Sequence, residues 1–456
     1  MKGKICWVVG LARSGCAAGG LLRRQGATVL GIDDSDTATV HRRWEREGLS
    51  QLAPKAFDEI LTGGNWPDIT GSGRPDLVVI SPGVPGDHPR LQALAADVPI
   101  IGELELGARY CQARTVAITG TNGKTTTTEL TAHLGRTAGL DARALGNVGR
   151  PLCDVAEEMG PEALAVVETS SFQLETMRDF APEVGVVLNL APDHLDRYPD
   201  LSAYYQAKRI MASLVPAIGT FVTSTDCAEA RAWSVAGSRR LFGDEVEGAD
   251  VFFREGQLMA AGQPLVALKD LAQQSPPNLL NALAATTIGL ALQLDEAALA
   301  QGLADFPGLP DRHQWVASRG GVKFINDTKA TNVHAVCAGL SGYAGQVVLI
   351  VGGSGKGEDY TPLREVMSAV RNVVLIGAEG PAIGQALLGT VPTTTATSMD
   401  EAVALAVEMA EPDAAVLLSP ACASFDMFAN YGERGRAFTA AALKVGAQAV
   451  PDQGPK

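Results

Sequence analysis

The residues Val116-Ala117-Ile118-Thr119-Gly120-Thr121-Asn122-Gly123-Lys124-Thr125-Thr126-Thr127 decide the fold class of this chain. A β-branched run leads into a glycine-rich loop, and Leu130 and Leu134 continue with the spacing of a helix face. Backbone N–H groups of such a loop can surround phosphates, while the Lys124 ammonium reaches the β/γ oxygens and the Thr125 hydroxyl binds Mg²⁺. The loop is shorter than the standard phosphate-binding pattern, so a turn without a ligand stays open. We expect ATP here, contacted by Gly120, Thr121, Asn122, Gly123, Lys124, Thr125 and Thr126.

The same succession of strand, glycine turn and Ala/Leu-rich helix recurs along the chain. Continuous apolar runs are typical of strands that are buried on both faces, as in parallel sheets flanked by helices. We therefore predict an α/β protein with several open sheets. The predicted strands are Cys6–Val9, Thr28–Ile32, Leu77–Ile80, Val116–Thr119, Ala165–Val167, Gly185–Asn189, Val347–Val351, Val373–Ile376 and Ala415–Leu418.

The length of 456 residues corresponds to roughly three domains at about 150 residues each. One break is expected after Val98-Pro99-Ile100, before the strand–loop–helix unit that begins near Thr115. A second is expected at Phe306-Pro307-Gly308-Leu309-Pro310, where prolines and a glycine interrupt a helical stretch. The predicted domains are residues 1–102, 103–308 and 309–456.

Composition and charge exclude several classes of protein. Lys and Arg number 37 against 51 Asp and Glu, for a net charge of -14, which argues against coating nucleic acid or an anionic membrane. The longest apolar runs, such as Val347–Val351, fall far short of the roughly 20 residues that span a bilayer. The seven cysteines form no Cys-x-x-Cys pair and predict buried free thiols in a reducing compartment. We expect a cytoplasmic protein with neither nucleic-acid nor membrane partners.

A first glycine loop, Val8-Val9-Gly10-Leu11-Ala12-Arg13-Ser14-Gly15, follows the first predicted strand, and Asp33 lies at the end of the next one. It resembles the dinucleotide fingerprint, with Ala12 at the middle glycine. Three alternatives stay open: a turn without a ligand, an NAD(P) site, or a site for another phosphate-bearing ligand. Ser81-Pro82-Gly83 is a further turn where phosphates could bind.

Two candidate metal ligands follow neighbouring predicted strands. Glu168 comes directly after Ala165–Val167, and His194 lies just beyond Gly185–Asn189. The carboxyl ends of strands in an open α/β sheet are where ligands bind, so both positions favour a metal role beside the phosphate loop. Lys208 lies on an amphipathic helical stretch, and that pattern alone predicts a solvated lysine.

Four motifs together resemble the Mur ligases of peptidoglycan synthesis: Gly120–Thr125, Glu168–Leu174, Asp193–Tyr198 and Asn326–Asn332. A fifth, Leu418-Ser419-Pro420-Ala421-Cys422-Ala423-Ser424-Phe425-Asp426, is similar to the branch of the family that adds D-glutamate. The likeness extends from Val8 to about Phe438.

The resemblance implies a layout and a reaction. It implies a Rossmann-like N-terminal domain that holds the UDP group, a central P-loop ATPase-type domain with a parallel sheet, and a Rossmann-like C-terminal domain that closes over ATP and the amino acid. ATP would phosphorylate the L-alanyl carboxylate of UDP-N-acetylmuramoyl-L-alanine. The amine of D-glutamate would then attack the acyl phosphate, releasing phosphate and leaving an amide. A monomer is expected.

The resemblance also implies roles for individual residues. Lys124, Glu168, His194 and Lys208 would be catalytic; Thr125 and Glu168 would hold one Mg²⁺, and His194 would help to hold a second, together with Lys208 carbamylated by CO₂. Further ATP contacts would come from Asn278, Asn281, Arg312 and Asp327. The UDP-substrate contacts would be Ser14, Asp34, Ser35, Ser81, Gly83 and Asn147. The D-glutamate contacts would be Lys329, Thr331, Lys356, Ser424, Phe425 and Tyr431. Two lysines and several hydroxyls suit a ligand with two carboxylates.

The chain departs from the family pattern at several positions: Asp34 and Ser35 replace a Thr-Arg pair, and Asp311, Pro277 and Ser354 also differ. A sister ligase or a folylpolyglutamate ligase is the alternative enzyme, which the Ser-Pro-Ala-Cys-Ala-Ser-Phe-Asp stretch disfavours. A UDP-sugar- and ATP-binding sensor is the alternative outside enzymes.

Overall fold

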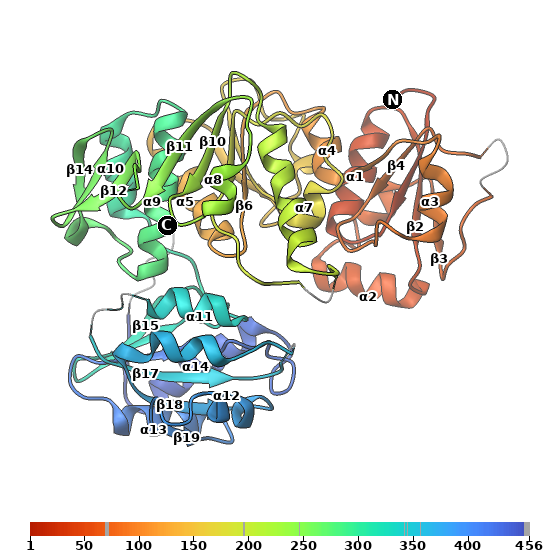
Figure 1. The fold of residues 1–456 in the computed structure, drawn as a ribbon. Coiled ribbons are helices and arrows are strands. Elements are labelled where there is room, and N and C mark those ends of the chain that lie inside the picture. The colour runs from red at the N-terminus through yellow and green to blue at the C-terminus, as the bar shows by residue number, and fades with distance from the viewer. Residues whose placement is uncertain are drawn as a thin grey trace. The chain divides into compact units, whose positions relative to one another are not determined.

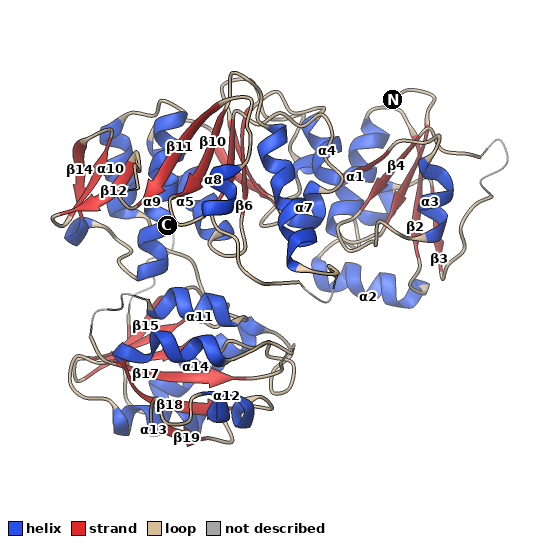
Figure 2. Cartoon of the chain, viewed as in Figure 1, coloured by secondary structure: helices blue, strands red, loops and turns tan. Residues whose placement is uncertain are grey.

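Three β-sheets with helices packed on them organise the chain, as Figures 1 and 2 show in a computed structural model. The structure describes residues 1–68, 73–194, 197–245, 247–341, 343, 345–355 and 357–450. In the described residues the fold is α/β and rich in parallel strand pairs, as the sequence predicts.

The first sheet is parallel throughout its described strands. These are β1 (Ile5–Val9), β2 (Thr28–Asp33), β3 (Glu59–Thr62), β4 (Leu77–Ile80) and β5 (Ile100–Gly102), in the order β3-β2-β1-β4-β5. Its helices are α1 (Arg13–Arg24), α2 (Thr37–Glu47) and α3 (Pro89–Ala95), and α4 (Glu103–Ala108) follows β5. Strand order reverses at β1, so the loops after β1 and β4 lie at the switch point where α/β sheets bind ligands.

The second sheet has the order β14-β13-β12-β11-β10-β9-β6-β8-β7. Its strands are β6 (Arg114–Thr119), β7 (Ala142–Gly146), β8 (Leu164–Glu168), β9 (Val184–Val187), β10 (Thr220–Ser224), β11 (Ser238–Gly243), β12 (Val251–Arg254), β13 (Gln257–Ala260) and β14 (Gln263–Ala267). Pairing is parallel from β7 to β12, and β12 pairs with β13 in the antiparallel sense. The associated helices are α5 (Lys124–Thr137), α6 (Ser171–Leu174), α7 (Leu201–Leu214), α8 (Ala228–Ala232), α9 (Pro276–Ala291) and α10 (Glu296–Asp305).

The third sheet has the order β19-β18-β17-β20-β16-β15-β21. Its strands are β15 (Gln314–Arg319), β16 (Val322–Asn326), β17 (Val347–Gly352), β18 (Val370–Ile376), β19 (Thr393–Thr395), β20 (Ala415–Leu418) and β21 (Gln448–Ala449). The five strands from β19 to β16 are parallel, and β15 is antiparallel to both of its neighbours. Its helices are α11 (Val333–Leu340), α12 (Gly380–Ala386), α13 (Met399–Met409) and α14 (Tyr431–Lys444). Short 3₁₀-helices along the chain are η1 (Ala53–Ala56), η2 (Leu152–Asp154), η3 (Leu268–Asp270) and η4 (Thr361–Ala369).

Alternate residues of the predicted strands enter different cores. Cys6 and Val8 of β1 pack in one apolar cluster, whereas Trp7 and Val9 pack in another. The same alternation divides β17, so both faces of these sheets are buried. All nine predicted strands are present, and β9 ends at Val187, two residues earlier than predicted.

The chain divides into two compact units. One contains Met1–Leu190, His194–Leu265 and Leu283–Gly302, with the first two sheets; the other contains Ala191–Asp193, Val266–Ala282 and Leu303–Lys456, with the third. All seven cysteines are free; five are buried, and Cys111 and Cys337 are half-buried rather than buried as predicted. Within the described part of the chain, no helix is both long and apolar enough to cross a membrane.

Candidate functional site

The loop Gly120–Gly123 connects β6 to α5 and leaves the first N–H groups of α5 without a side-chain cap. Gly123 has a φ of 83° in the left-handed region, where a glycine is favoured. The Lys124 ammonium donates to the carbonyls of Gly120 at 2.9 Å and Thr121 at 2.8 Å, so it lies folded over the loop. A loop of backbone donors with a lysine above it is an arrangement that can bind a polyphosphate.

Asn189, which the sequence analysis did not single out, braces this loop. Its Oδ1 accepts from the N–H of Thr121 at 3.1 Å and of Asn122 at 2.9 Å, and its Nδ2 donates to the Asn122 carbonyl at 3.0 Å. Asn189 follows β9, which pairs with β6 in parallel, so its side chain lies at the same sheet edge as the loop. A polar residue after a buried strand next to the loop-bearing strand was the signal for it.

Glu168 ends β8, the other parallel neighbour of β6. Its Oε1 accepts from the Asn147 amide at 2.8 Å, and the Asn147 N–H donates to the Glu168 carbonyl at 3.0 Å. Its Oε2 is buried and has no hydrogen-bond partner among the described residues. A buried carboxylate oxygen without a hydrogen bond destabilises the fold unless a cation or a donor binds it. This position therefore fits a divalent metal. Asn147, assigned to the UDP substrate by the resemblance, orients this carboxylate.

Lys208, on α7, is 1% exposed, so the prediction of a solvated helix lysine is wrong. Its ammonium donates to the Gly120 carbonyl at 2.9 Å and lies 3.4 Å from the Thr119 hydroxyl. It also lies 4.8 Å from the centre of the Tyr204 ring. The helix turns this face toward the phosphate loop because Tyr204 and Ala207 on it are also buried.

His194 lies among aromatic rings, one of which, Tyr204, also contacts Lys208. Its ring meets Phe172 edge to face at 5.1 Å and Tyr204 at 5.9 Å, and its backbone has a φ of 55°. A non-glycine residue in this left-handed region is uncommon and marks a constrained position. Among the described residues, no three or more His, Cys, Asp or Glu side chains group closely enough to hold a metal. A metal here would therefore also use other oxygen ligands, for example water, the Thr125 hydroxyl, a substrate oxygen or a modified Lys208.

The first glycine loop packs against the Ser81 turn. A Cβ at Gly15 would lie 1.9 Å from the Gly10 carbonyl oxygen, so only glycine fits there. The Ser81 hydroxyl donates to the same carbonyl at 2.7 Å, which means that it braces the loop. Asp33 accepts from the N–H of Leu11 and Ser35 and from Arg43. Burial raises the pKa of Asp33, but these hydrogen bonds outweigh it and hold the pKa below its usual value.

The other proposed UDP contacts have different surroundings. Asp34 accepts from Trp66 Nε1 at 2.8 Å and pairs with His88 Nε2 at 3.2 Å. The Ser35 hydroxyl accepts from Arg43 at 3.2 Å, so α2 brings an arginine to the position that lacks one in sequence. Two further candidates complete this set: half-buried Ser14 in the first turn of α1 and exposed Gly83 in the turn after β4.

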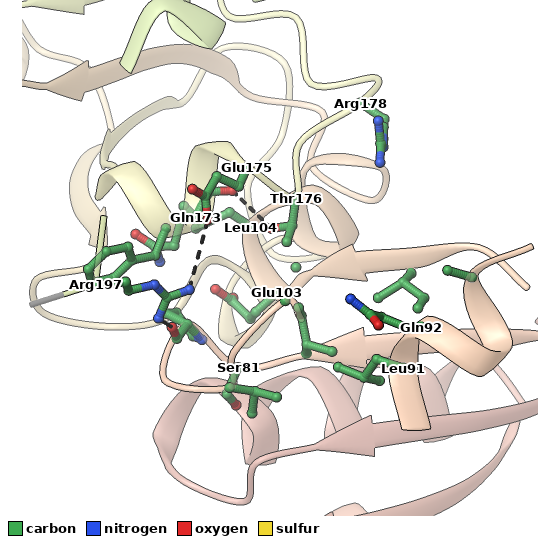
Figure 3. A pocket seen from close by; sticks show the side chains of 18 residues that line it. Ser81, Leu91, Gln92, Glu103, Leu104, Gln173, Glu175, Thr176, Arg178 and Arg197 are labelled. Atoms are coloured by element: carbon green, nitrogen blue, oxygen red, sulfur yellow. Dashed lines mark hydrogen bonds and ion pairs between the residues drawn. The ribbon is translucent and has the colours of Figure 1, made fainter. Parts of the chain in front are cut away.

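A cavity of about 230 Å³ lies between the first sheet and the segment around α6 (Figure 3). Ser81, Glu103 and Gln92 line it, and Arg197 at its edge pairs with Glu175 at 3.8 Å. Among the predicted site residues it includes Ser81 and none from the phosphate loop. It is therefore separate from the cluster of Lys124, Glu168 and Lys208.

The predicted nucleotide contacts outside the loop are buried or half-buried. Asn278 and Asn281 lie one turn apart on α9, and the amide of Asn281 lies 3.5 Å from Asn278 Oδ1. Half-buried Arg312 precedes β15. Asp327 follows β16 and is held by His313 and Ser419: the Ser419 hydroxyl donates at 2.9 Å, and His313 Nδ1 lies 3.2 Å away.

The predicted D-glutamate contacts come from loops at one edge of the third sheet. Lys329 and Thr331 follow β16, and Ser424 and Phe425 follow its parallel neighbour β20. Tyr431 begins α14, and its ring centre lies 3.9 Å from the Lys329 ammonium. Ser424 is buried, whereas the Phe425 side chain is 74% exposed. Lys356 lies outside the described residues.

Comparison with known proteins gives a consistent family. The model of the Mur ligase middle domain matches residues 118–260, and that of the Mur ligase glutamate ligase domain matches residues 311–422. The chain is 38% identical to the UDP-N-acetylmuramoylalanine–D-glutamate ligase of Acidobacterium capsulatum, over 96% of each chain. It is 39% identical to the enzyme of the same name from Methylococcus capsulatus, over 95% of this chain and 93% of that one.

Solved structures show the same fold at lower identity. A pseudomurein peptide ligase type C from Methanothermus fervidus aligns with a TM-score of 0.59 and 17% identity, covering 97% of this chain and 100% of that one. MurF ligase from Thermotoga maritima, in complex with ADP, aligns with a TM-score of 0.58 and 15% identity, covering 92% and 96%. At these identities the likeness establishes the fold alone.

Proposed function

The chain belongs to the Mur ligase family, and we propose that it is an ATP-dependent ligase that joins D-glutamate to UDP-N-acetylmuramoyl-L-alanine in peptidoglycan precursor synthesis. The observation that carries this proposal is the cluster at one sheet edge: Lys124 and Lys208 over the phosphate loop, with the buried Glu168 carboxylate after a neighbouring strand. Identity of 37–39% to D-glutamate ligases over nearly the whole chain supports the choice of amino acid.

The reaction has two chemical steps. An oxygen of the L-alanyl carboxylate attacks the γ-phosphorus of ATP, the bond to the β-phosphate oxygen breaks, and ADP leaves. The D-glutamate amine then attacks the acyl-phosphate carbon, loses a proton, and expels inorganic phosphate to leave an amide. The carboxylate and the triphosphate repel each other because both are anionic. Lys124 and the backbone N–H groups of Gly120–Gly123 must therefore neutralise the phosphate charge before the carboxylate can approach the γ-phosphorus.

The donor set at this edge suits Mg²⁺. The unpartnered Oε2 of Glu168 and the Thr125 hydroxyl would hold one ion, and His194 would help to hold a second. When bound, Mg²⁺ supplies charge neutralisation at the phosphoryl oxygens. Asn147 keeps Glu168 oriented through its 2.8 Å hydrogen bond.

Lys208 completes the second metal site if CO₂ converts its amine to a carbamate. An ammonium beside two divalent cations would be repulsive, whereas a carbamate is an anionic oxygen ligand. The burial of Lys208 at the Gly120 carbonyl supports this role, because a carbamate there is protected from solvent.

The substrate contacts divide between loops. Ser14, Asp34, Ser35, Ser81 and Gly83 would hold the UDP group beside the first glycine loop, with Arg43 as an added cation near Ser35. Asn278, Asn281, Arg312 and Asp327 would hold the nucleotide. Lys329, Thr331, Lys356, Ser424, Phe425 and Tyr431 would hold D-glutamate.

The proposal includes three domains, at residues 1–102, 103–308 and 309–456, in a monomer of the cytoplasm. Its partners are the three small-molecule substrates, with neither nucleic acid nor a membrane among them.

A panel of amino acids tests the function. ADP release is measured with UDP-N-acetylmuramoyl-L-alanine and ATP, in the presence of D-glutamate, L-glutamate, L-alanine or L-lysine. We expect D-glutamate alone to stimulate release and to give a product heavier by one glutamyl residue. L-Glutamate is the matched control, because it carries the same charges with the opposite configuration. Stimulation by another amino acid in place of D-glutamate would overturn the assignment.

A further inference from the structure

Arg434 is a buried guanidinium in the first turn of α14 that belongs to none of the predicted sites. It is 1% exposed, and its Nε donates to the Thr328 hydroxyl at 2.9 Å. Its Nη2 donates to the Thr328 carbonyl at 2.9 Å, and its Nη1 to the carbonyls of Cys422 at 3.0 Å and Ala423 at 3.1 Å. All of these acceptors are neutral oxygens, and they belong to two separate loops.

The two loops are those that carry the proposed acceptor contacts. Thr328 directly precedes Lys329 in the loop after β16, and Ala423 directly precedes Ser424 in the loop after β20. The planar guanidinium therefore bridges them one residue away from both side chains. The rigid, planar set of donors in a guanidinium can bridge two loops better than the single flexible ammonium of a lysine can.

Two further contacts fix α14 against the first loop. The Thr328 hydroxyl donates to the Tyr431 carbonyl at 3.0 Å. A Cβ at Gly435 would lie 2.9 Å from the Thr328 methyl carbon, so the helix approaches this loop as closely as a glycine permits. Arg434 thus lies at the contact between a helix and both loops.

Burial of a charge with neutral partners is an expensive way to stabilise a fold. Burial lowers the pKa of Arg434 to about 10. Apolar residues of similar volume often stabilise a core as well as, or better than, a buried charge does. The cost is understandable if the hydrogen bonds set a geometry that packing alone does not.

We infer that Arg434 is a positioning residue for the acceptor amino acid, because it holds together the two loops that carry Lys329 and Ser424. This inference rests on the proposed function. An acceptor with two carboxylates needs both loops at one fixed separation, and the guanidinium provides it. Neither the phosphate loop nor the first glycine loop depends on this bridge.

The test compares kinetic constants of four variants. In Arg434→Lys we expect the KM for D-glutamate to rise about tenfold, as for the loss of hydrogen bonds to a charged group, while the KM values for ATP and the UDP substrate stay within about twofold. Thr328→Val removes only the hydroxyl and should raise the D-glutamate KM about threefold, whereas Thr328→Ser, which keeps it, should restore the wild-type value. Phe438→Leu is the control, because Phe438 is a buried apolar residue one turn further along α14.

The outcomes separate a positioning role from a structural one. The inference is overturned if the D-glutamate KM is unchanged in the Thr328→Val and Arg434→Lys variants, or if all three KM values rise together. It is also overturned if Phe438→Leu raises the D-glutamate KM as selectively as Arg434→Lys does. Where Arg434→Lys does not fold, the Thr328→Val and Thr328→Ser pair decides alone. Where the wild-type enzyme does not use D-glutamate, the proposed function has failed, and the same comparison is made with the amino acid that the panel identifies.

Discussion

Lys208 is a buried cation in a stretch of sequence that predicts a solvated helix face. Its ammonium lies against the Gly120 carbonyl and above the Tyr204 ring, where the environment is partly apolar. Burying an ammonium costs several kcal/mol even when it is hydrogen-bonded, so the position is expected to have a chemical purpose. Conversion to a carbamate would give the side chain the opposite charge and an affinity for metal.

Substitution of Lys208 tests that purpose. In Lys208→Ala we expect the rate of ADP release to fall by at least about 100-fold and to be partly restored by added acetate, which replaces the lost carboxylate. Arg209→Ala is the matched control, because Arg209 is the adjacent residue and is exposed. Native mass spectrometry of the wild-type enzyme should show the added mass of one CO₂. Active enzyme with unmodified Lys208, together with no rescue by acetate, contradicts the carbamate.

The phosphate loop is the element that the sequence predicts best, yet the sequence gives only a weak signal for one of its supports. Asn189 is a single polar residue after β9, and nothing in its neighbours indicates that its amide faces the loop. Only the parallel pairing of β9 with β6 brings it to the N–H groups of Thr121 and Asn122. Spacing along the chain does not encode such a contact between strands.

Two substitutions of Asn189 measure this support. In Asn189→Ala we expect the KM for ATP to rise about tenfold, because the loop loses its brace, while the KM for the amino acid stays unchanged. Asn189→Asp keeps an acceptor for the two N–H groups but adds a negative charge beside the phosphates, so the ATP KM should rise further. An unchanged ATP KM in both variants rules out a bracing role.

Helix α1 offers a prediction about packing in the first glycine loop. In Gly15→Ala the new methyl group would collide with the Gly10 carbonyl oxygen, so we expect the free energy of unfolding to fall by about 3 kcal/mol. Gly20 lies on the same helix, and a Cβ there would meet only the tip of Arg24, at 3.4 Å. Gly20→Ala should therefore be neutral or stabilising by up to about 1 kcal/mol. Equal stability of both variants in urea unfolding would contradict this account.

Several of the strands that contain polar residues were missed, and β10 shows why. β10 is buried, but its sequence Thr220–Ser224 contains hydroxyl residues that obscure the apolar run. The structure satisfies them individually; the Thr223 hydroxyl, for example, donates to the Val187 carbonyl at 2.8 Å. Burial of a polar residue depends on a partner from another strand, which one strand's sequence does not specify.

At the scale of the whole molecule, motifs predicted which side chains lie at one sheet edge better than they predicted which charged side chains are buried. Glu168 and Lys124 each follow a predicted strand, and the structure pairs those two strands in parallel, so both residues lie at one sheet edge. The burial of Lys208 and Arg434 could not be predicted, because the segment around each residue has the pattern of a polar helix face. Buried charges depend on tertiary partners, and those partners are distant in sequence: Arg434 contacts Thr328.

Glu103 is a further buried charged group, and it makes the stability of the first compact unit depend on pH. Glu103 begins α4, and its Oε1 accepts from the Cys153 N–H at 2.7 Å, while its Oε2 is buried without a hydrogen-bond partner among the described residues. Burial raises the pKa of this carboxyl from 4.5 to about 7. The folded state therefore keeps a proton that the unfolded state releases, so this contribution is complete below pH 4.5 and is lost as pH rises to about 7.

The size and sign of that loss can be measured by unfolding at a series of pH values. Between pH 4.5 and pH 7 the wild-type protein should lose about 3 kcal/mol through Glu103. Glu103→Gln remains neutral and should be more stable than wild type at pH 8 but not at pH 4.5.

Glu105 is the control, because its buried carboxylate accepts from the N–H groups of Arg178, Asp179 and Phe180. Glu105→Gln weakens charged hydrogen bonds and should destabilise the protein by about 2 kcal/mol at pH 8. Two buried carboxyls of the same short helix should therefore respond with opposite signs to the same substitution. Destabilisation by both at pH 8 would mean that the hydrogen bonds of Glu103 outweigh the cost of burying its charge, and would contradict a raised pKa.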